Sequence, residues 1–177
     1  MVIITGGIDL SIGPLAATAG VVSALILENN ENLLAPAILA GIVSAAIVSM
    51  WTGMLVAKMR IAPFIASLST MSIAKGVVLV IADGVPHTIK DKTYTNIGNG
   101  FLWDPAKTGG LSIPIPIVIF AAVAVLVGIV LYKTRYGRHI YAVGGNEHAA
   151  IASGVNTTKV KFCTYVFNGV LCGIAGI

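Results

Sequence analysis

Two long stretches of the chain carry no charged residue, and they constrain the fold more than any other feature. Residues 32–57 and 108–132 contain no Asp, Glu, Lys or Arg, and each stretch exceeds the ~20 residues that cross a bilayer as a helix. A helix of a soluble domain needs a polar face, which these stretches almost entirely lack. The chain of 177 residues is 56% apolar and 10% charged, with a mean hydropathy of +0.93, whereas a soluble domain has about 25% charged residues. We therefore predict an all-α, polytopic membrane helix bundle.

Five apolar segments predict five membrane spans within a single transmembrane domain. They cover about residues 10–27, 33–57, 61–82, 113–132 and 160–177. The connections between them differ in charge. Glu28 and Glu31 flank the first connection, Lys58 and Arg60 mark the second, the third mixes both signs, and the fourth is basic. Because short basic loops stay in the cytoplasm, we expect a cytoplasmic loop at 133–160 and an extracytoplasmic loop at 83–112.

Both ends of the sequence are apolar. Residues 1–5 lack the basic region of a signal peptide and are typical of the tail of a preceding membrane helix. The fifth segment is still apolar at Ile177. We therefore expect the chain to be truncated at both ends and to be part of a larger membrane protein.

The second predicted span has a small residue at every fourth position. Small residues at this spacing let two helix backbones approach closely, which is how membrane helices associate. We predict close helix packing along this ridge, and the lining of a substrate path is the alternative. The ridge consists of Ala37, Gly41, Ala45, Ser49, Gly53 and Ala57, and Gly169 and Gly173 repeat the pattern in the fifth span.

The third predicted span is rich in hydroxyl groups and contains one charge. The side chains of Ser67 and Thr70 could line a polar path, or they could bond the carbonyl groups of their own helix. Lys75 is a functional candidate because charges inside membrane spans are costly. It is also close enough to the outer end for its stem to reach the interface.

A break in the helical pattern stands at residues 5–14. Gly6 and Gly7 end an apolar run, and either Asp9 or Ser11 can cap a new helix, with Pro14 tolerated in its first turns. Non-helical backbone at membrane depth survives only where protein buries it or water reaches it. We interpret the motif as a broken helix near a transport path, with an ordinary surface loop as the alternative.

The basic loop contains a second motif. Asn146 is a suitable N-cap, Glu147 favours the positive start of a helix, and Gly154 suits the position after its end. A helix of about two turns is predicted between them, with an exposed apolar surface for a protein partner. The residues assigned to this surface and its flanks are Gly144, Gly145, Asn146, Glu147, Ala149, Ala150, Ile151, Ser153 and Gly154.

These motifs together resemble the permease subunits of bacterial ATP-binding-cassette importers for simple sugars, the ribose, xylose and galactose permease family. The resemblance covers nearly the whole chain. It implies that the loop after Gly144 contains a coupling helix that docks on an ATPase. One departure is Ile151, where relatives often have a basic residue. The segments that carry this resemblance to the sugar permease family are 6–13, 62–66, 70–74, 135–138, 140–147 and 153–156.

The resemblance also implies a mechanism and partners. The chain would form the path for a monosaccharide in the cytoplasmic membrane of a bacterium, as one of two permease subunits, with a separate ATPase and a soluble sugar-binding protein. A facilitator or channel without a motor is the alternative.

We predict no catalytic site, no cofactor, no metal site and no nucleic-acid partner, since the sequence has no Walker motif or triad. His87, His139 and His148 are expected to be solvated loop residues. Cys163 and Cys172, nine positions apart on one predicted helix, should not form a disulfide.

Overall fold

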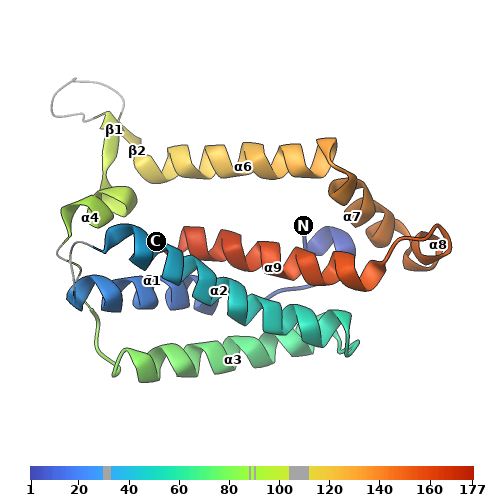
Figure 1. Ribbon diagram of the computed structural model, residues 1–177, viewed down its shortest axis with the longest axis horizontal. Coiled ribbons are helices and arrows are strands. Elements are labelled where there is room, and N and C mark those ends of the chain that lie inside the picture. Colours follow the sequence, from blue (N-terminus) through green and yellow to red (C-terminus); the bar gives the residue numbers. More distant parts are fainter. Residues whose placement is uncertain (30–32, 88, 90, 104–111) are drawn as a thin grey trace.

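The computed structural model describes all residues except 30–32, 88, 90 and 104–111, so Glu31 and part of the predicted 83–112 loop lie outside it. The described residues are mainly helical, which confirms the predicted all-α class. They form the 3-10 helix η1 (Ile3–Thr5), the α-helices α1 (Ile12–Asn29), α2 (Leu34–Ala57), α3 (Pro63–Ile81), α4 (Lys92–Asn99), α6 (Ile115–Lys133), α7 (Arg135–Gly145), α8 (Glu147–Ala152) and α9 (Thr157–Ala175), and the strands β1 (Phe101–Trp103) and β2 (Ile113–Pro114) (Figure 1).

Helices occupy all five segments for which the sequence predicts membrane spans. Three of them, α2, α3 and α6, are long and apolar enough to cross a membrane. Helix α1 supplies a shorter apolar segment, Ile12–Glu28, and α9 carries Lys159 and Lys161 near its start. Membrane crossing by α1 and α9 therefore stays a prediction.

The ridge of small residues places α2 between two other helices. All six residues of the ridge are buried. A Cβ atom added at Gly41 would lie 2.7 Å from the carbonyl oxygen of Ala19 in α1, and one added at Gly53 would lie 2.9 Å from Cβ of Tyr165 in α9. Ser49 adds a polar link, because its hydroxyl donates to the Tyr165 carbonyl oxygen over 2.6 Å. The α2 backbone can therefore approach both neighbours closely.

Helix α9 contributes glycines of its own to this contact. A Cβ atom at Gly169 would meet Cβ of Ser49 and would lie 3.0 Å from the carbonyl oxygen of Ala45. A Cβ atom at Gly173 would lie 2.8 Å from Cα of Ile42. Several of these contacts involve backbone atoms, which cannot move aside as a flexible side chain can.

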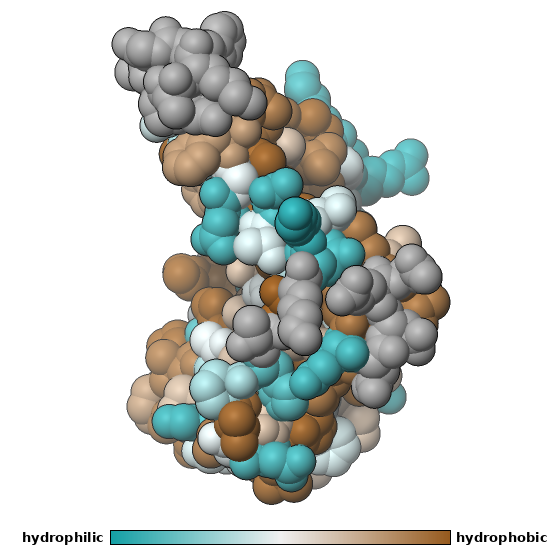
Figure 2. All heavy atoms as spheres, turned by 90° about the vertical axis from the view of Figure 1, so that its left-hand side faces the viewer, coloured by the Kyte–Doolittle hydropathy of each residue, from teal (hydrophilic) through white to brown (hydrophobic). Residues whose placement is uncertain are grey.

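The predicted 83–112 loop contains more regular structure than the sequence analysis expects. Asp91 caps α4 by accepting a hydrogen bond from the Tyr94 backbone N–H over 2.7 Å, and the Tyr94 side chain is buried against Leu27 and Ala37. Strands β1 and β2 pair as an antiparallel hairpin. Figure 2 looks at this end of the molecule and shows hydrophilic side chains gathered there among hydrophobic ones.

Helix α6 lies apart from the other long helices. None of its residues is buried, and Figure 1 shows it running alongside α9 without packing on it, joined to the rest through β2 and α4 at one end and α7 at the other. Its side chains are almost all apolar. A helix of this composition is stable only with lipid or further helices around it.

Candidate functional site

The two basic connections of the sequence meet at one end of the bundle. Figure 1 shows the turn between α2 and α3 at the same end as α7 and α8. Arg60 from this turn and Lys161 from the first turns of α9 line a common pocket. The structure therefore brings both basic connections to one end of the bundle, and their side of the membrane stays a prediction.

Helix α8 is defined at both ends by local hydrogen bonds. The side chain of Asn146 accepts from the Ala149 backbone N–H over 3.0 Å, which satisfies one of the free donors at the helix start. Gly154 has a φ of +80°, and the Val155 backbone N–H bonds back to the Ala150 carbonyl oxygen over 3.0 Å. The left-handed residue closes the helix as glycine readily does.

A further cap orients the start of α9. The side chain of Asn156 accepts from the Lys159 backbone N–H over 2.9 Å. Only four residues, 153–156, separate the end of α8 from the start of α9. Caps at Asn146 and Asn156 therefore restrict how α8 can move relative to the long helix behind it.

The apolar surface predicted on α8 is smaller than the sequence analysis expects. Ala150 is 4% exposed and packs against Ile140, Val143 and Val160, so the expectation that it faces a partner is wrong. Ala149 and Ile151 are exposed, and Ile151 keeps 54% of its surface accessible. A helix this short must turn one residue inward to be held in place, and Ala150 does so.

The sequence analysis also missed α7, which fills most of the segment before α8. Thr134 caps it by accepting from the Gly137 backbone N–H over 3.1 Å. Its apolar residues Ile140 and Val143 are buried beneath α8 and α9, while its basic residues remain exposed. The missed signal was the apolar spacing of residues 136, 140 and 143, which is helical.

Glu147 forms an ion pair with a side chain of this chain, so its carboxylate group is not wholly free to bind a partner. Both of its carboxylate oxygens accept from Nζ of Lys161, at 2.8 and 2.7 Å. The hydrogen bond with Lys161 is the main cause that lowers the pKa of Glu147 below its usual range. The pair joins the first residue of α8 to the first turns of α9.

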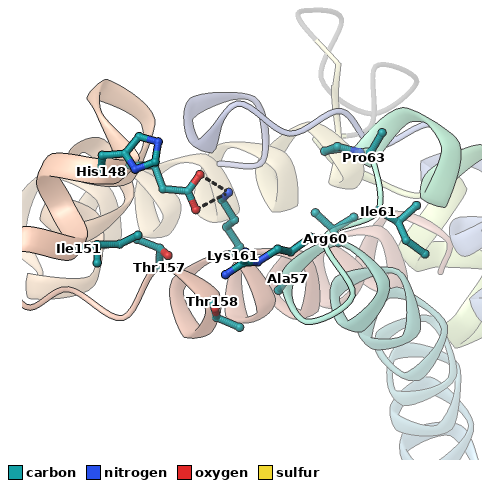
Figure 3. Close-up of a pocket in the computed structure, with 12 residues that line it drawn as sticks. Ala57, Arg60, Ile61, Pro63, His148, Ile151, Thr157, Thr158 and Lys161 are labelled. Atoms are coloured by element: carbon teal, nitrogen blue, oxygen red, sulfur yellow. Dashed lines mark hydrogen bonds and ion pairs between the residues drawn. The ribbon is translucent and has the colours of Figure 1, made fainter.

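A pocket of about 350 Å³ opens beside this ion pair (Figure 3). One wall is the end of α2 and the α2–α3 turn, with Ala57, Arg60 and Pro63; the opposite wall is α8 and the start of α9, with His148 and Thr158. Arg60 has a φ of +55°. Such a backbone conformation is uncommon for residues other than glycine and often occurs at functional sites.

Gly144 and Gly145 have different surroundings although the motif places them side by side. A Cβ atom added at Gly144 would collide with the carbonyl oxygen of Ile4 and would lie 2.9 Å from its carbonyl carbon. A Cβ atom at Gly145 would meet nothing within 4 Å. Gly144 therefore allows α7 to contact η1 through the backbone.

This difference makes a direct prediction. Gly144→Ala should separate α7 from η1 and destabilise the folded protein by about 1–3 kcal/mol, because a backbone carbonyl must move. Gly145→Ala should change stability by no more than about 1 kcal/mol, because alanine favours a helix over glycine. The midpoint of thermal unfolding in detergent would measure both. Equal midpoints for the two variants would contradict the contact with Ile4.

The predicted break at residues 6–11 is present in the backbone. Gly6 ends η1 with a φ of +75°, and α1 begins only at Ile12, partway along the bundle (Figure 1). Asp9 Oδ1 accepts from the Ser11 backbone N–H over 2.9 Å and from the Ser11 hydroxyl. The two polar residues of the motif thus bond each other in the segment just before α1, and a cap on a helix N–H by either of them stays a prediction.

Helix α9 holds this break in place. Asn168 Nδ2 donates to Asp9 Oδ2 over 2.9 Å, and the Tyr165 hydroxyl donates to the Ile8 carbonyl oxygen over 3.4 Å. Gly7 lies against the same tyrosine, since an added Cβ would be 2.9 Å from its hydroxyl oxygen. The sequence analysis did not single out Asn168, although an amide within an apolar helix is a recognised signal for contact between helices.

The hydroxyl groups of α3 bond within the bundle. Ser67 and Thr70 are buried, and they donate to the carbonyl oxygens of Phe64 and Ala66 over 3.2 and 3.0 Å. Thr52 of α2 donates to the Thr70 hydroxyl over 2.9 Å. These contacts favour the alternative in which the two side chains bond the carbonyl groups of their own helix over a polar path. Lys75 is exposed on α3.

The histidines and cysteines are spread over several elements, although His139 and Cys163 line a common pocket. His87 is not a solvated loop residue, since its Nδ1 lies 2.8 Å from Glu28 Oε2 and its side chain is 20% exposed. His139 and His148 are exposed, and Cys163 and Cys172 are free thiols. Within the described residues, no group of three or more His, Cys, Asp or Glu side chains could hold a metal ion.

Comparison with known proteins places the chain in a family. The family model described as the branched-chain amino acid transport system / permease component matches residues 1–177. The ribose import permease protein RbsC of Bacillus subtilis (strain 168) is 39% identical over 178 residues, covering 99% of this chain and 52% of the relative. No solved structure gives a significant match.

The names of two further relatives refer to other substrates. The galactofuranose transporter permease protein YtfT of Escherichia coli (strain K12) is 36% identical, covering 100% of this chain and 49% of the relative. The L-arabinose transport system permease protein AraH of the same strain is 32% identical, covering 98% and 50%. The chain spans about half the length of the curated relatives it matches. Because the family model matches all of its residues and three of its helices can cross a membrane, this chain is a multi-pass membrane protein that belongs to the branched-chain amino acid transport system / permease component family.

Proposed function

We propose that this chain contributes to the transmembrane subunit of an ATP-driven importer, which forms the path for a monosaccharide. The relatives named for ribose, L-arabinose and galactofuranose support a sugar as the substrate class. The partners would be an ATPase subunit, a second permease subunit, which can be another copy of the same protein, and a soluble sugar-binding protein. The site of action would be the cytoplasmic membrane of a bacterium.

The observation that carries this proposal is α8, a short helix held rigidly at the basic end of the bundle. Its caps and the buried Ala150 fix its position, while Ile151 and Ala149 remain exposed for a partner. A channel or facilitator without a motor has no use for such an element. An importer needs one, because a soluble ATPase must push on the membrane helices.

A displacement of α8 would be transmitted to the membrane helices through two sets of contacts. The Glu147–Lys161 ion pair joins it to α9, and the cluster around Ala150 joins it to α7 and to Val160 of α9. Helix α9 in turn packs closely along α2. A displacement of α8 would therefore be passed to the centre of the bundle through contacts that are already formed.

The helix break is the part of the described chain that best suits a transport path. Gly6, Gly7, Asp9 and Ser11 place non-helical backbone and a carboxylate partway along the bundle, as broken helices do in many transporters. Asn168 would keep this carboxylate in position. The tightly packed residues Ser67 and Thr70 fit a supporting role better than a lining role.

The test is a cross-link from α8 to the ATPase combined with sugar uptake. In the full-length protein, Ile151→Cys should cross-link to the ATPase subunit, and uptake should require ATP hydrolysis. Gly154→Val should lower both, because a β-branched residue at a φ of +80° costs about 1–3 kcal/mol in strain.

Gly154→Asn is the matched control, because asparagine tolerates the left-handed conformation. It should retain the cross-link and the uptake rate. Uptake that continues without ATP hydrolysis, with no cross-link at residue 151, would reject the importer and favour the facilitator.

A further inference from the structure

The pocket between the α2–α3 turn and α8 has a charge that its own residues do not balance. Lys161 is neutralised by Glu147 at 2.7 Å. Within the described part of the chain, Arg60 has no ion-pair partner, although it lines the same pocket and is exposed. Figure 3 shows its side chain reaching from the turn towards the start of α9, with Lys161 nearby. The pocket therefore presents an unmatched guanidinium group, with the imidazole of His148 on its other side.

The backbone at Arg60 strengthens this observation. A left-handed conformation with a φ of +55° is unfavourable for arginine, and glycine or asparagine would suit the turn better. The Ile61 backbone N–H bonds back to the Leu55 carbonyl oxygen over 3.2 Å, so the conformation closes the end of α2. This closure explains the backbone at residue 60 but not the choice of arginine. A planar guanidinium group is well suited to bind a carboxylate through two hydrogen bonds.

The apolar residues around the pocket indicate a protein partner. Ile151 of α8 lines the pocket and is 54% exposed, and Ile61 lies in the pocket wall. Met59, which precedes Arg60 in the turn, is 60% exposed. Arginine is enriched in protein interfaces, and the exposed apolar side chains beside it offer area that a protein partner can bury. These residues belong to two segments about 90 residues apart, since the pocket joins residues 56–63 to residues 147–161.

We propose that this pocket receives an acidic side chain of the ATPase subunit, so that the α2–α3 turn and α8 together form the docking surface. The inference rests on the function proposed above and adds a second segment, a specific residue and a chemical partner to it. Arg60 would bind the incoming carboxylate, and Lys161 would remain paired with Glu147. Ile151 and Ile61, which line the pocket, would exclude water around the ion pair.

The experiment measures ATPase binding to the full-length protein in nanodiscs. Arg60→Glu should weaken binding about tenfold or more, since reversing a charge in a complementary interface costs more than removing a rim contact. Arg60→Asn, which keeps a residue suited to the left-handed backbone, should weaken binding less. Arg60→Lys should bind between the parent and Arg60→Asn, because it keeps the charge but cannot form the paired hydrogen bonds of the guanidinium group. Arg135→Glu is the matched control, because Arg135 is an exposed arginine of α7 that lies outside the pocket, and it should change binding by less than about twofold.

A second readout separates the pocket from the coupling function. The Ile151→Cys cross-link at saturating ATPase should persist in Arg60→Glu, and an Arg60→Cys variant should itself cross-link to the ATPase. Unchanged affinity in Arg60→Glu with an intact Ile151→Cys cross-link would reject the pocket but leave the importer in place. Absence of the Ile151→Cys cross-link with the native Arg60 would reject the importer.

The lipid composition of the nanodiscs distinguishes a protein carboxylate from a lipid phosphate. The affinity loss in Arg60→Glu should be the same in phosphatidylcholine and in phosphatidylglycerol nanodiscs. A loss seen only with the anionic lipid would show that the pocket holds a headgroup, and would overturn the proposal.

Discussion

Replacing Gly169 with leucine should prevent α9 from packing along α2 and should strongly reduce the amount of folded protein in the membrane. Even a single Cβ atom at this position would meet Cβ of Ser49 and would lie 3.0 Å from both the carbonyl oxygen of Ala45 and Cα of Ala46. Overpacking of this kind costs about 1–3 kcal/mol, and two of the three opposing atoms belong to the backbone. Folded yield from membranes and the midpoint of thermal unfolding would measure the loss.

Gly128→Leu is the matched control for this experiment. Gly128 lies in α6, where an added Cβ atom would meet nothing within 4 Å, so this variant should remain close to the parent. Gly169→Ala should fall between the two. A Gly169→Leu protein with the parental midpoint would show that α2 and α9 do not approach as closely as the structure indicates.

Reversing the charge at Glu147 should uncouple the proposed importer while leaving it inserted in the membrane. Glu147→Lys removes both hydrogen bonds to Lys161 and places two ammonium groups beside each other. It also places a base at the positive start of α8, which costs about 0.3–1 kcal/mol. Coupling free energies are typically about 1–3 kcal/mol, so we expect ATP-driven uptake to fall by roughly 5- to 150-fold.

A charge swap tests whether the ion pair itself is responsible. The double variant Glu147→Lys/Lys161→Glu restores opposite charges and should recover part of the uptake, with the helix-start penalty remaining. Lys159→Glu changes an exposed lysine two positions from Lys161 that has no ion pair in the described residues, and it should behave as the parent. No recovery in the double variant would mean that Glu147 acts on a partner rather than through Lys161.

The pH dependence of this pair has a defined direction. The pKa of Glu147 is lowered in the folded protein, from an ordinary value of 4.5. A lowered carboxyl pKa adds stability above the unfolded-state value, and this contribution is lost as the pH falls through the folded-state value. The pair should therefore remain intact throughout the neutral range, and pH changes there should not mimic Glu147→Lys.

The sequence alone determined the fold class and the positions of the long helices, because both depend on local composition. Uncharged stretches longer than a bilayer crossing must be helical in lipid, since every backbone group needs an internal partner. The caps of α8 could also be predicted from the sequence, because Asn146 and Gly154 act on residues within a few positions. The ridge on α2 was visible because its period of four matches one face of a helix.

Only the tertiary structure decided which surfaces these elements present to one another. The inward orientation of Ala150, the pairing of Glu147 with Lys161, and the contact of Asn168 with Asp9 join residues from different elements, and no local pattern specifies such pairs. Gly144 and Gly145 are indistinguishable as neighbours in sequence, yet only Gly144 faces the Ile4 backbone. The pocket around Arg60 exists because folding brings residues 56–63 beside residues 147–161, and contacts between segments so far apart depend on the packing of the whole bundle.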